Sequence, residues 1–328
     1  MPSLSVVRNF IATYAPPYVP VIVITGGTSG IGQGIAEAFA RTVHGKAHII
    51  LVGRNRIAAE AIIASLPKST GASDQSTYEF ISCDVTLMKN VHAMTKDLNQ
   101  RLPKINFLVH CAGVLGFGGR KETEEGIDEK LASRYYSRWA STHDLLPLLR
   151  KAKEAGEPAS VLSVLGAGRG PEVDLEDLGL KKTYSGMKAM VQSLAYNDLM
   201  VAVSASLFKA PVESNPLFCL VQEFARREPE IAFTHAFPGA VNTGWLKPNN
   251  LILASIIFLL RPILWFILMT KETCGDIMLF NLLDSEKGMY RRNERGDEIG
   301  LTNFPQAKDA QRLLWEHTAE ATTVDEGN

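Results

Sequence analysis

The chain has 328 residues, of which 46% are hydrophobic and 21% charged, a composition typical of a globular protein. Its formal net charge of −1 argues against a nucleic-acid partner. The four cysteines are scattered, with no CxxC pair and no histidine at metal-ligand spacing, so we expect reduced thiols, no metal site and a cytoplasmic location. We expect no secretory signal. We predict an N-terminal leader at 1–19, one domain at 20–304 and a C-terminal tail at 305–328.

The first candidate site is the segment VIVITGGTSGIG, residues 21–32. Its β-branched start predicts a buried strand, and the apolar period that follows predicts a helix. A strand, a glycine-rich turn and a helix in this order form a cradle for a pyrophosphate, because the helix presents free N–H groups to the anion. The alternative is an ordinary strand-to-helix turn. The candidate cofactor residues of this segment are Gly26, Thr28, Ser29, Gly30, Ile31 and Gly32.

A second buried strand is predicted at 48–52, and Gly53, Arg54 and Asn55 follow it. In a dinucleotide-binding fold the end of this strand faces the adenosine ribose. An acidic residue there favours NAD, whereas an arginine can pair with a 2′-phosphate. No acidic residue stands at this end, so we predict NADP(H), with a solvated turn arginine as the alternative.

A helix is predicted at 56–66 and a third strand at 78–82, before Asp84 and Val85. Asp84 lies just beyond the carboxyl end of a parallel strand, where such sheets bind ligands. Its carboxylate or the neighbouring backbone could accept a hydrogen bond from an adenine amino group. Alternatively, Asp84 caps the helix predicted at 86–100.

The fourth strand, 105–109, leads into Ala112 and Gly113, whose small side chains let the backbone approach a cofactor. Further along the chain we predict a helix at about 125–151, a fifth strand at 160–165 and a sixth at 233–237. Strands that alternate with helices predict an α/β fold with a doubly wound parallel sheet in a single domain.

Tyr184 and Lys188 are four residues apart on a predicted helix, so both side chains should project from one face. A lysine ammonium near a phenol favours the phenolate and lowers its pKa. Tyr184 could then donate or accept a proton near neutral pH.

These motifs together resemble the short-chain dehydrogenase/reductase family, over roughly residues 20–290. The matching segments are TGGTSGIG, GRN, CDV, CAG, YSGMK and PGAVNT. The resemblance implies a Rossmann-type fold. It also implies that Tyr184 transfers the proton and that Lys188 holds the nicotinamide ribose. The family segment that packs on the nicotinamide corresponds to Pro238, Gly239, Val241 and Thr243. The closing KETCGD and LLDSEKGMY segments resemble reductases of fungal secondary metabolism.

Two catalytic positions depart from the family pattern. The family's substrate-binding serine falls at Gly166, and Ser163, three residues earlier, should point to the opposite face. We keep Ser163 as a candidate substitute. The family's relay asparagine falls at Arg134, which we list among the cofactor residues, and the usual NNAG reads HCAG.

Two segments do not match the family. Residues 201–220 are interpreted as an insertion near the substrate side, and we expect folding to survive its deletion. Residues 246–272 are interpreted as a hydrophobic flap, whose centre at 251–269 is nearly all apolar but carries Arg261 and Pro262 in its middle. We favour a wall for the substrate there, with contact to a membrane surface or a membrane-spanning segment as the alternatives. A homodimer is possible. We expect a short C-terminal helix near Trp315 and disorder after it.

The leading hypothesis is an NADPH-dependent oxidoreductase that reduces a carbonyl group of a hydrophobic small molecule, or oxidises an alcohol. One alternative is an enzyme derived from this family with isomerase, dehydratase or cyclase chemistry. The other is a non-catalytic nucleotide-binding partner.

Overall fold

The computed structural model describes residues 2–69, 76–201, 224–243, 268–306 and 309–324. Its centre is a parallel sheet in the order β3-β2-β1-β4-β5-β6-β7. The strands are β1 (Val21–Thr25), β2 (His48–Gly53), β3 (Thr77–Ser82), β4 (Phe107–His110), β5 (Ser160–Val164), β6 (Ala232–Ala236) and β7 (Gly288–Arg292).

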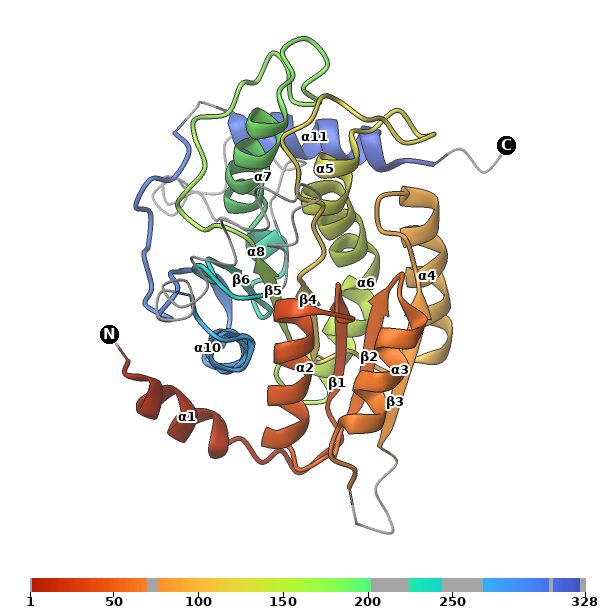
Figure 1. Ribbon diagram of the computed structural model, residues 1–328, viewed down its shortest axis with the longest axis vertical. Coiled ribbons are helices and arrows are strands. Elements are labelled where there is room, and N and C mark those ends of the chain that lie inside the picture. Colours follow the sequence, from red (N-terminus) through yellow and green to blue (C-terminus); the bar gives the residue numbers. More distant parts are fainter. Residues whose placement is uncertain (1, 70–75, 202–223, 244–267, 307–308, 325–328) are drawn as a thin grey trace, which may run out of the picture.

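Helices cover both faces of this sheet (Figure 1). The first layer contains α1 (Leu4–Ala12), α2 (Gly30–Thr42), α3 (Arg56–Ser65) and α10 (Lys271–Leu283). The second layer contains α4 (Met88–Arg101), α5 (Glu129–Leu131), the π-helical turn η1 (Ala132–Tyr136), α6 (Ser137–Glu154), α7 (Gly186–Val201), α8 (Phe224–Arg227) and α11 (Ala310–Thr322). The doubly wound α/β sheet predicted from the sequence is therefore confirmed.

The strands divide their side chains between the two layers because successive residues of a strand point to opposite faces. In β1, Val21 and Val23 pack with the α4 and α6 layer, whereas Ile22 and Ile24 pack with the α2 and α10 layer. All four are buried. This two-sided burial explains the unbroken apolar run in the sequence.

Several boundaries and two elements differ from the predictions. The long helix expected from residue 125 starts only after Asp128, which caps α5, and passes through η1 before α6. The seventh strand was not predicted, because β7 contains the buried residues Arg291 and Arg292. The disorder expected after Trp315 is wrong for residues 318–322, since α11 continues and buries Thr318 and Thr322 against the domain.

The N-terminal helix α1 lies against the domain, because it buries Val7 and Ile11 in the core that α10 shares. The predicted insertion beyond Val201 and residues 246–267 of the predicted flap lie outside the described residues. Among the helices that the structure describes, none combines the length and the apolar character needed to cross a membrane.

Candidate active site

A cleft with a cavity of about 760 Å³ lies at the carboxyl ends of the strands. Loops after β1 to β6 and the turn η1 supply its walls. This is the edge at which doubly wound sheets bind ligands. The lining residues are Gly26, Thr28–Gly32, Gly53, Arg54, Cys83–Thr86, Cys111–Leu115, Ser133, Arg134, Arg138, Val164, Leu165, Pro238–Val241 and Thr243.

The glycine-rich turn after β1 is packed so closely that side chains would not fit. A Cβ atom on Gly26 (φ +76°) would lie 2.5 Å from the backbone nitrogen of Ala112, and one on Gly32 would lie 2.4 Å from the Gly26 carbonyl oxygen. Ser29, the N-cap residue of α2, makes no side-chain hydrogen bond to the helix. The backbone N–H groups in the first turn of α2 are therefore not capped by the Ser29 side chain. They face the cleft, as a phosphate cradle requires.

At the ends of β2 and β3, Arg54 and Asp84 face each other with 3.7 Å between Nη1 and Oδ2. Asp84 is not a helix cap, because its Oδ1 atom accepts the backbone N–H of Thr86, before α4 begins. Asn55 does cap a helix: its Oδ1 atom accepts the Ala58 N–H, and the side chain does not line the cleft. The Asn55 side chain is thus engaged with α3, and its role in cofactor binding stays a prediction.

Two buried arginines line the opposite end of the cleft. Arg138 is 1% exposed and Arg134 is 7% exposed. Arg138 donates through Nη1 to Ser163 Oγ at 2.7 Å and to the Val164 carbonyl oxygen at 3.1 Å, and through Nη2 to the Ala112 carbonyl oxygen at 2.7 Å. Burial lowers the pKa of Arg138 to about 9 and that of Arg134 to about 10, because it penalises the charged form.

Ser163 cannot replace the missing family serine. It is fully buried, and its hydroxyl accepts from Arg138 and donates to Asn197 Oδ1 at 2.6 Å. Gly166 also lies outside the lining. A Cβ atom there would meet Leu194 Cδ2 at 2.9 Å. Val164 and Leu165 are the residues at the end of β5 that do line the cleft.

Tyr184 and Lys188 are not placed as predicted, because α7 begins at Gly186, after Tyr184. The Tyr184 hydroxyl donates to Asp128 Oδ2 at 2.9 Å and accepts from Lys130 Nζ at 3.0 Å. Lys188 instead contacts Asp174 Oδ2 at 3.1 Å. Neither Tyr184 nor Lys188 is among the residues that line the cleft.

The expected lowering of the Tyr184 pKa is also wrong. Burial is the main cause and raises the pKa of Tyr184; Lys130 opposes this shift, and Asp128 adds to it. A cation does contact the phenol, but it is Lys130 from α5, which no sequence motif pointed to.

The cleft brings together most of the predicted cofactor residues. They are Gly26, Thr28, Ser29, Gly30, Ile31, Gly32, Arg54, Asp84, Val85, Ala112, Gly113, Arg134, Pro238, Gly239, Val241 and Thr243. Sequence reasoning missed Arg138, although its spacing of four from Arg134 was a signal that both occupy one side of a helix. Cys111, which occupies an asparagine position of the family pattern, also lines the cleft.

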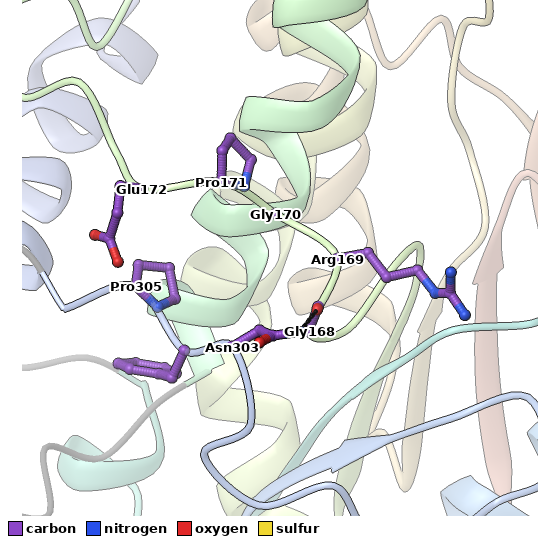
Figure 2. A pocket seen from close by; sticks show the side chains of 8 residues that line it. Gly168, Arg169, Gly170, Pro171, Glu172, Asn303 and Pro305 are labelled. Atoms are coloured by element: carbon purple, nitrogen blue, oxygen red, sulfur yellow. Dashed lines mark hydrogen bonds between the residues drawn. The ribbon is translucent and has the colours of Figure 1, made fainter.

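A second cavity, of about 520 Å³, lies between residues 168–172 and 303–305 (Figure 2). Its one arginine, Arg169, extends away from Pro171 and Pro305 and stacks on the Phe237 ring, 3.7 Å from its centroid. None of the predicted site residues lines this cavity. The cleft at the strand ends is therefore the candidate active site.

Comparisons with known proteins agree with this geometry. A family model described as short chain dehydrogenase matches residues 20–196. The chain is 34% identical to oxidoreductase AN1596 of Emericella nidulans over 66% of this chain and 57% of that protein. It is 28% identical to oxidoreductase andH of Emericella variicolor, over 85% of this chain and 74% of that protein. The aligned region thus spans little more than half of AN1596.

Solved structures share the fold at low sequence identity. RhlG of Pseudomonas aeruginosa, solved as a complex with NADP, superimposes with a TM-score of 0.57 at 15% identity and covers 85% of this chain and 96% of its own. At this identity the likeness establishes the fold alone.

Proposed function

We propose that this chain, which belongs to the short-chain dehydrogenase family, is an NADP(H)-dependent oxidoreductase that reduces a carbonyl group of a hydrophobic small molecule or oxidises the corresponding alcohol. The observation that carries the proposal is the cleft of about 760 Å³ between the glycine-rich turn and the ends of β4 to β6. It has the place and the walls that a dinucleotide requires in such a sheet. A role in fungal secondary metabolism is part of the proposal, supported by the likeness to the Emericella oxidoreductases.

The residues present fit a dinucleotide. The first turn of α2 offers N–H groups for the pyrophosphate, and the close approach of Gly26 to Ala112 keeps side chains out of that space. Arg54, at the end of β2, offers a guanidinium group for a 2′-phosphate. The NADP complex of RhlG is consistent with this choice of cofactor.

The apolar character of the cleft mouth supports a hydrophobic substrate. Leu115 lines the cleft and is 55% exposed. Phe117, two residues further along the same loop, is also exposed. Exposed apolar groups beside a cleft are a common feature of surfaces that receive apolar ligands.

When bound, NADPH supplies the hydride. In the proposed reaction Tyr184 would donate a proton to the reduced oxygen, and Lys188 would anchor the ribose, which requires that its ammonium group leave Asp174. Because Asp128 and Lys130 hold the Tyr184 hydroxyl outside the cleft lining, proton transfer requires that this hydroxyl leave Asp128 and turn toward the cleft. Replacement of Tyr184 is therefore the sharpest test of the proposed reaction.

The test is NADPH consumption with a panel of hydrophobic ketones and aldehydes. We expect consumption in the wild type and a loss of about 100-fold or more in Tyr184→Phe, the range that one positioned acid contributes. Tyr14→Phe is a matched control, because Tyr14 packs on Phe107 away from the cleft. Full activity in Tyr184→Phe would show that Tyr184 is not the proton donor.

One observation favours the second candidate, a non-redox enzyme derived from this family: the described lining contains arginines but neither Tyr184 nor Lys188. Product formation that survives the removal of NADPH would support isomerase, dehydratase or cyclase chemistry instead.

A further inference from the structure

Arg134 and Arg138 converge on one point of the cleft. A Cβ atom on Gly113 would lie 3.6 Å from Arg134 Nη1 and 4.0 Å from Arg138 Nη2. The two guanidinium groups therefore flank Gly113, at the carboxyl end of β4. We call these two residues the arginine pair.

The arginine pair has no anionic partner among the residues that the structure describes. Arg138 bonds only to neutral acceptors, which are the Ser163 hydroxyl and two carbonyl oxygens, and its Nε atom has no partner. Arg134 uses Nε to donate to Ser193 Oγ at 3.0 Å. A buried charge is normally paired, so two uncompensated positive charges beside a cavity call for an anion inside it.

The two arginines have different roles: Arg138 makes structural hydrogen bonds, and Arg134 is available to a ligand. Both terminal amino groups of Arg138 donate hydrogen bonds to residues at the ends of β4 and β5, and these bonds connect the two strand ends. No described residue accepts a hydrogen bond from the terminal amino groups of Arg134, although Arg134 lines the cleft. Arg134 is thus the member with donors to spare for a planar, two-oxygen group.

The position of the arginine pair separates it from the cofactor phosphates. The 2′-phosphate would bind beside Arg54, at the end of β2, and the pyrophosphate at the first turn of α2. The arginine pair instead stands at the ends of β4 and β5, in the other half of the sheet. Asp84 is the one carboxylate among the described lining residues, and it faces Arg54.

Apolar side chains line the cleft beside the arginine pair. Val114, Leu115, Val164 and Leu165 line the same end of the cleft. We therefore expect a ligand there to combine an anionic group with an apolar skeleton. A carboxylate offers two oxygens in the plane that a guanidinium group recognises.

We propose that the arginine pair binds a carboxylate of the substrate, so that the substrate is a hydrophobic carboxylic acid that also carries the reacting carbonyl or alcohol. The proposal rests on the proposed function for the reaction itself, but the carboxylate site is a property of Arg134, Arg138 and their apolar neighbours. Arg134 is the specificity-determining residue, and Arg138 holds the site together.

The test uses two probes of equal size, octanoate and its neutral analogue octanamide, titrated calorimetrically into the full chain with and without saturating NADPH. We expect octanoate to bind about tenfold or more tightly than octanamide, the effect of one charged contact. The proposal reassigns Arg134 from the cofactor to the substrate. In Arg134→Gln the octanoate affinity should therefore fall to that of octanamide, while the NADPH dissociation constant stays within about twofold. The affinity in Arg134→Lys, which keeps the charge but not the two-pronged geometry, should be intermediate.

Arg150→Gln is the matched control, because it also removes one arginine charge. Arg150 lies on α6 outside the cleft and pairs with Glu228. This variant should leave octanoate binding unchanged. Equal affinity for octanoate and octanamide in the wild type would overturn the carboxylate site, and this comparison needs no variant. The carboxylate site would also be overturned if Arg134→Gln lost as much affinity for NADPH as for octanoate, since the arginine pair would then bind the cofactor phosphates. Absence of NADPH binding with octanoate binding intact would reject the proposed cofactor and leave the carboxylate site standing.

Discussion

Arg54 stands at the end of β2 with 70% of its side chain exposed, 3.7 Å from Asp84. Such an exposed ion pair adds little to stability, so Arg54 can be replaced without harm to the fold. If it binds the 2′-phosphate, its replacement should weaken binding only of the cofactor that carries this phosphate.

We predict that Arg54→Gln weakens NADPH binding by about 10- to 150-fold, because a hydrogen bond to a charged group contributes about 1.5–3 kcal/mol. NADH binding should change by less than about twofold. Quenching of protein fluorescence by each cofactor measures both constants. Arg56→Gln serves as the control, since Arg56 is an exposed neighbour that pairs with Glu60 on α3. Equal losses for NADPH and NADH in Arg54→Gln would contradict the role of Arg54.

At the level of single residues, sequence reasoning located the cofactor side of the cleft better than the catalytic side. The glycines of the turn after β1 stand close together in the chain, and Gly32 packs directly on the Gly26 backbone, so their spacing is visible in the sequence even though Gly26 also packs on distant Ala112. The Tyr184 hydroxyl forms hydrogen bonds with Asp128 and Lys130, which lie more than fifty positions earlier in the chain, and no sequence motif predicts these contacts.

Two helices of the first layer, α2 and α10, meet through their glycines. A Cβ atom on Gly275 would lie 2.4 Å from the Gly34 carbonyl oxygen, and one on Gly34 would lie 2.6 Å from the Lys271 carbonyl oxygen. The backbones of the two helices therefore touch, and the contact seats α10 beside the glycine-rich turn.

We predict that Gly275→Ala lowers the free energy of unfolding by about 1–3 kcal/mol, the cost of an overpacked contact. Helix propensity alone predicts the opposite sign, a gain of about 1 kcal/mol. Urea unfolding decides between them. Gly119→Ala, where a Cβ atom meets nothing within 4 Å, should be close to neutral, and a stabilised Gly275→Ala would show that α2 and α10 are not in backbone contact.

His92 joins three helices of the second layer. Its Nδ1 atom lies 2.7 Å from Asp144 Oδ2 on α6, and its Nε2 atom lies 2.8 Å from the carbonyl oxygen of Thr322 on α11. Only the protonated imidazole donates at both nitrogens. The hydrogen bond to Asp144 is the largest cause that raises the pKa of His92 above its usual 6.5.

A group with a raised pKa in the folded state adds stability that is complete below its unfolded pKa and is lost as pH rises through the folded pKa. We therefore predict that His92→Gln costs more free energy of unfolding at about pH 5 than at about pH 9. His317 is a control of opposite sign: burial lowers its pKa, so His317→Gln should cost more at about pH 9. A pH-independent cost for His92→Gln would rule out this linkage.

At the level of elements, strands that are buried on both faces were predictable because their apolar runs are continuous. The seventh strand was not, because β7 buries Arg291. That arginine is tolerated because Asp198 on α7 accepts bidentate hydrogen bonds from it at 2.9 and 2.8 Å. The compensating charge lies 93 positions away, so no local pattern reveals it.

At the level of the whole molecule, the sheet divides the cleft into two chemically different halves. The half at β1 to β3 carries the uncapped helix terminus and the Arg54–Asp84 pair. The half at β4 to β6 carries the arginine pair and apolar side chains. This division matches the phosphates of the proposed cofactor in the first half, with its nicotinamide and the proposed acidic, hydrophobic substrate meeting in the second.

The most direct test of the central claim is hydride transfer itself. NADPH deuterated at its transferable position is incubated with the full chain and a panel of hydrophobic keto acids and their methyl esters, and the products are analysed by mass spectrometry. We expect deuterium on the carbinol carbon of the product, with the acids preferred over the esters. Products that contain no deuterium, or that form equally well without NADPH, would contradict the assignment of this chain as an NADP(H)-dependent oxidoreductase.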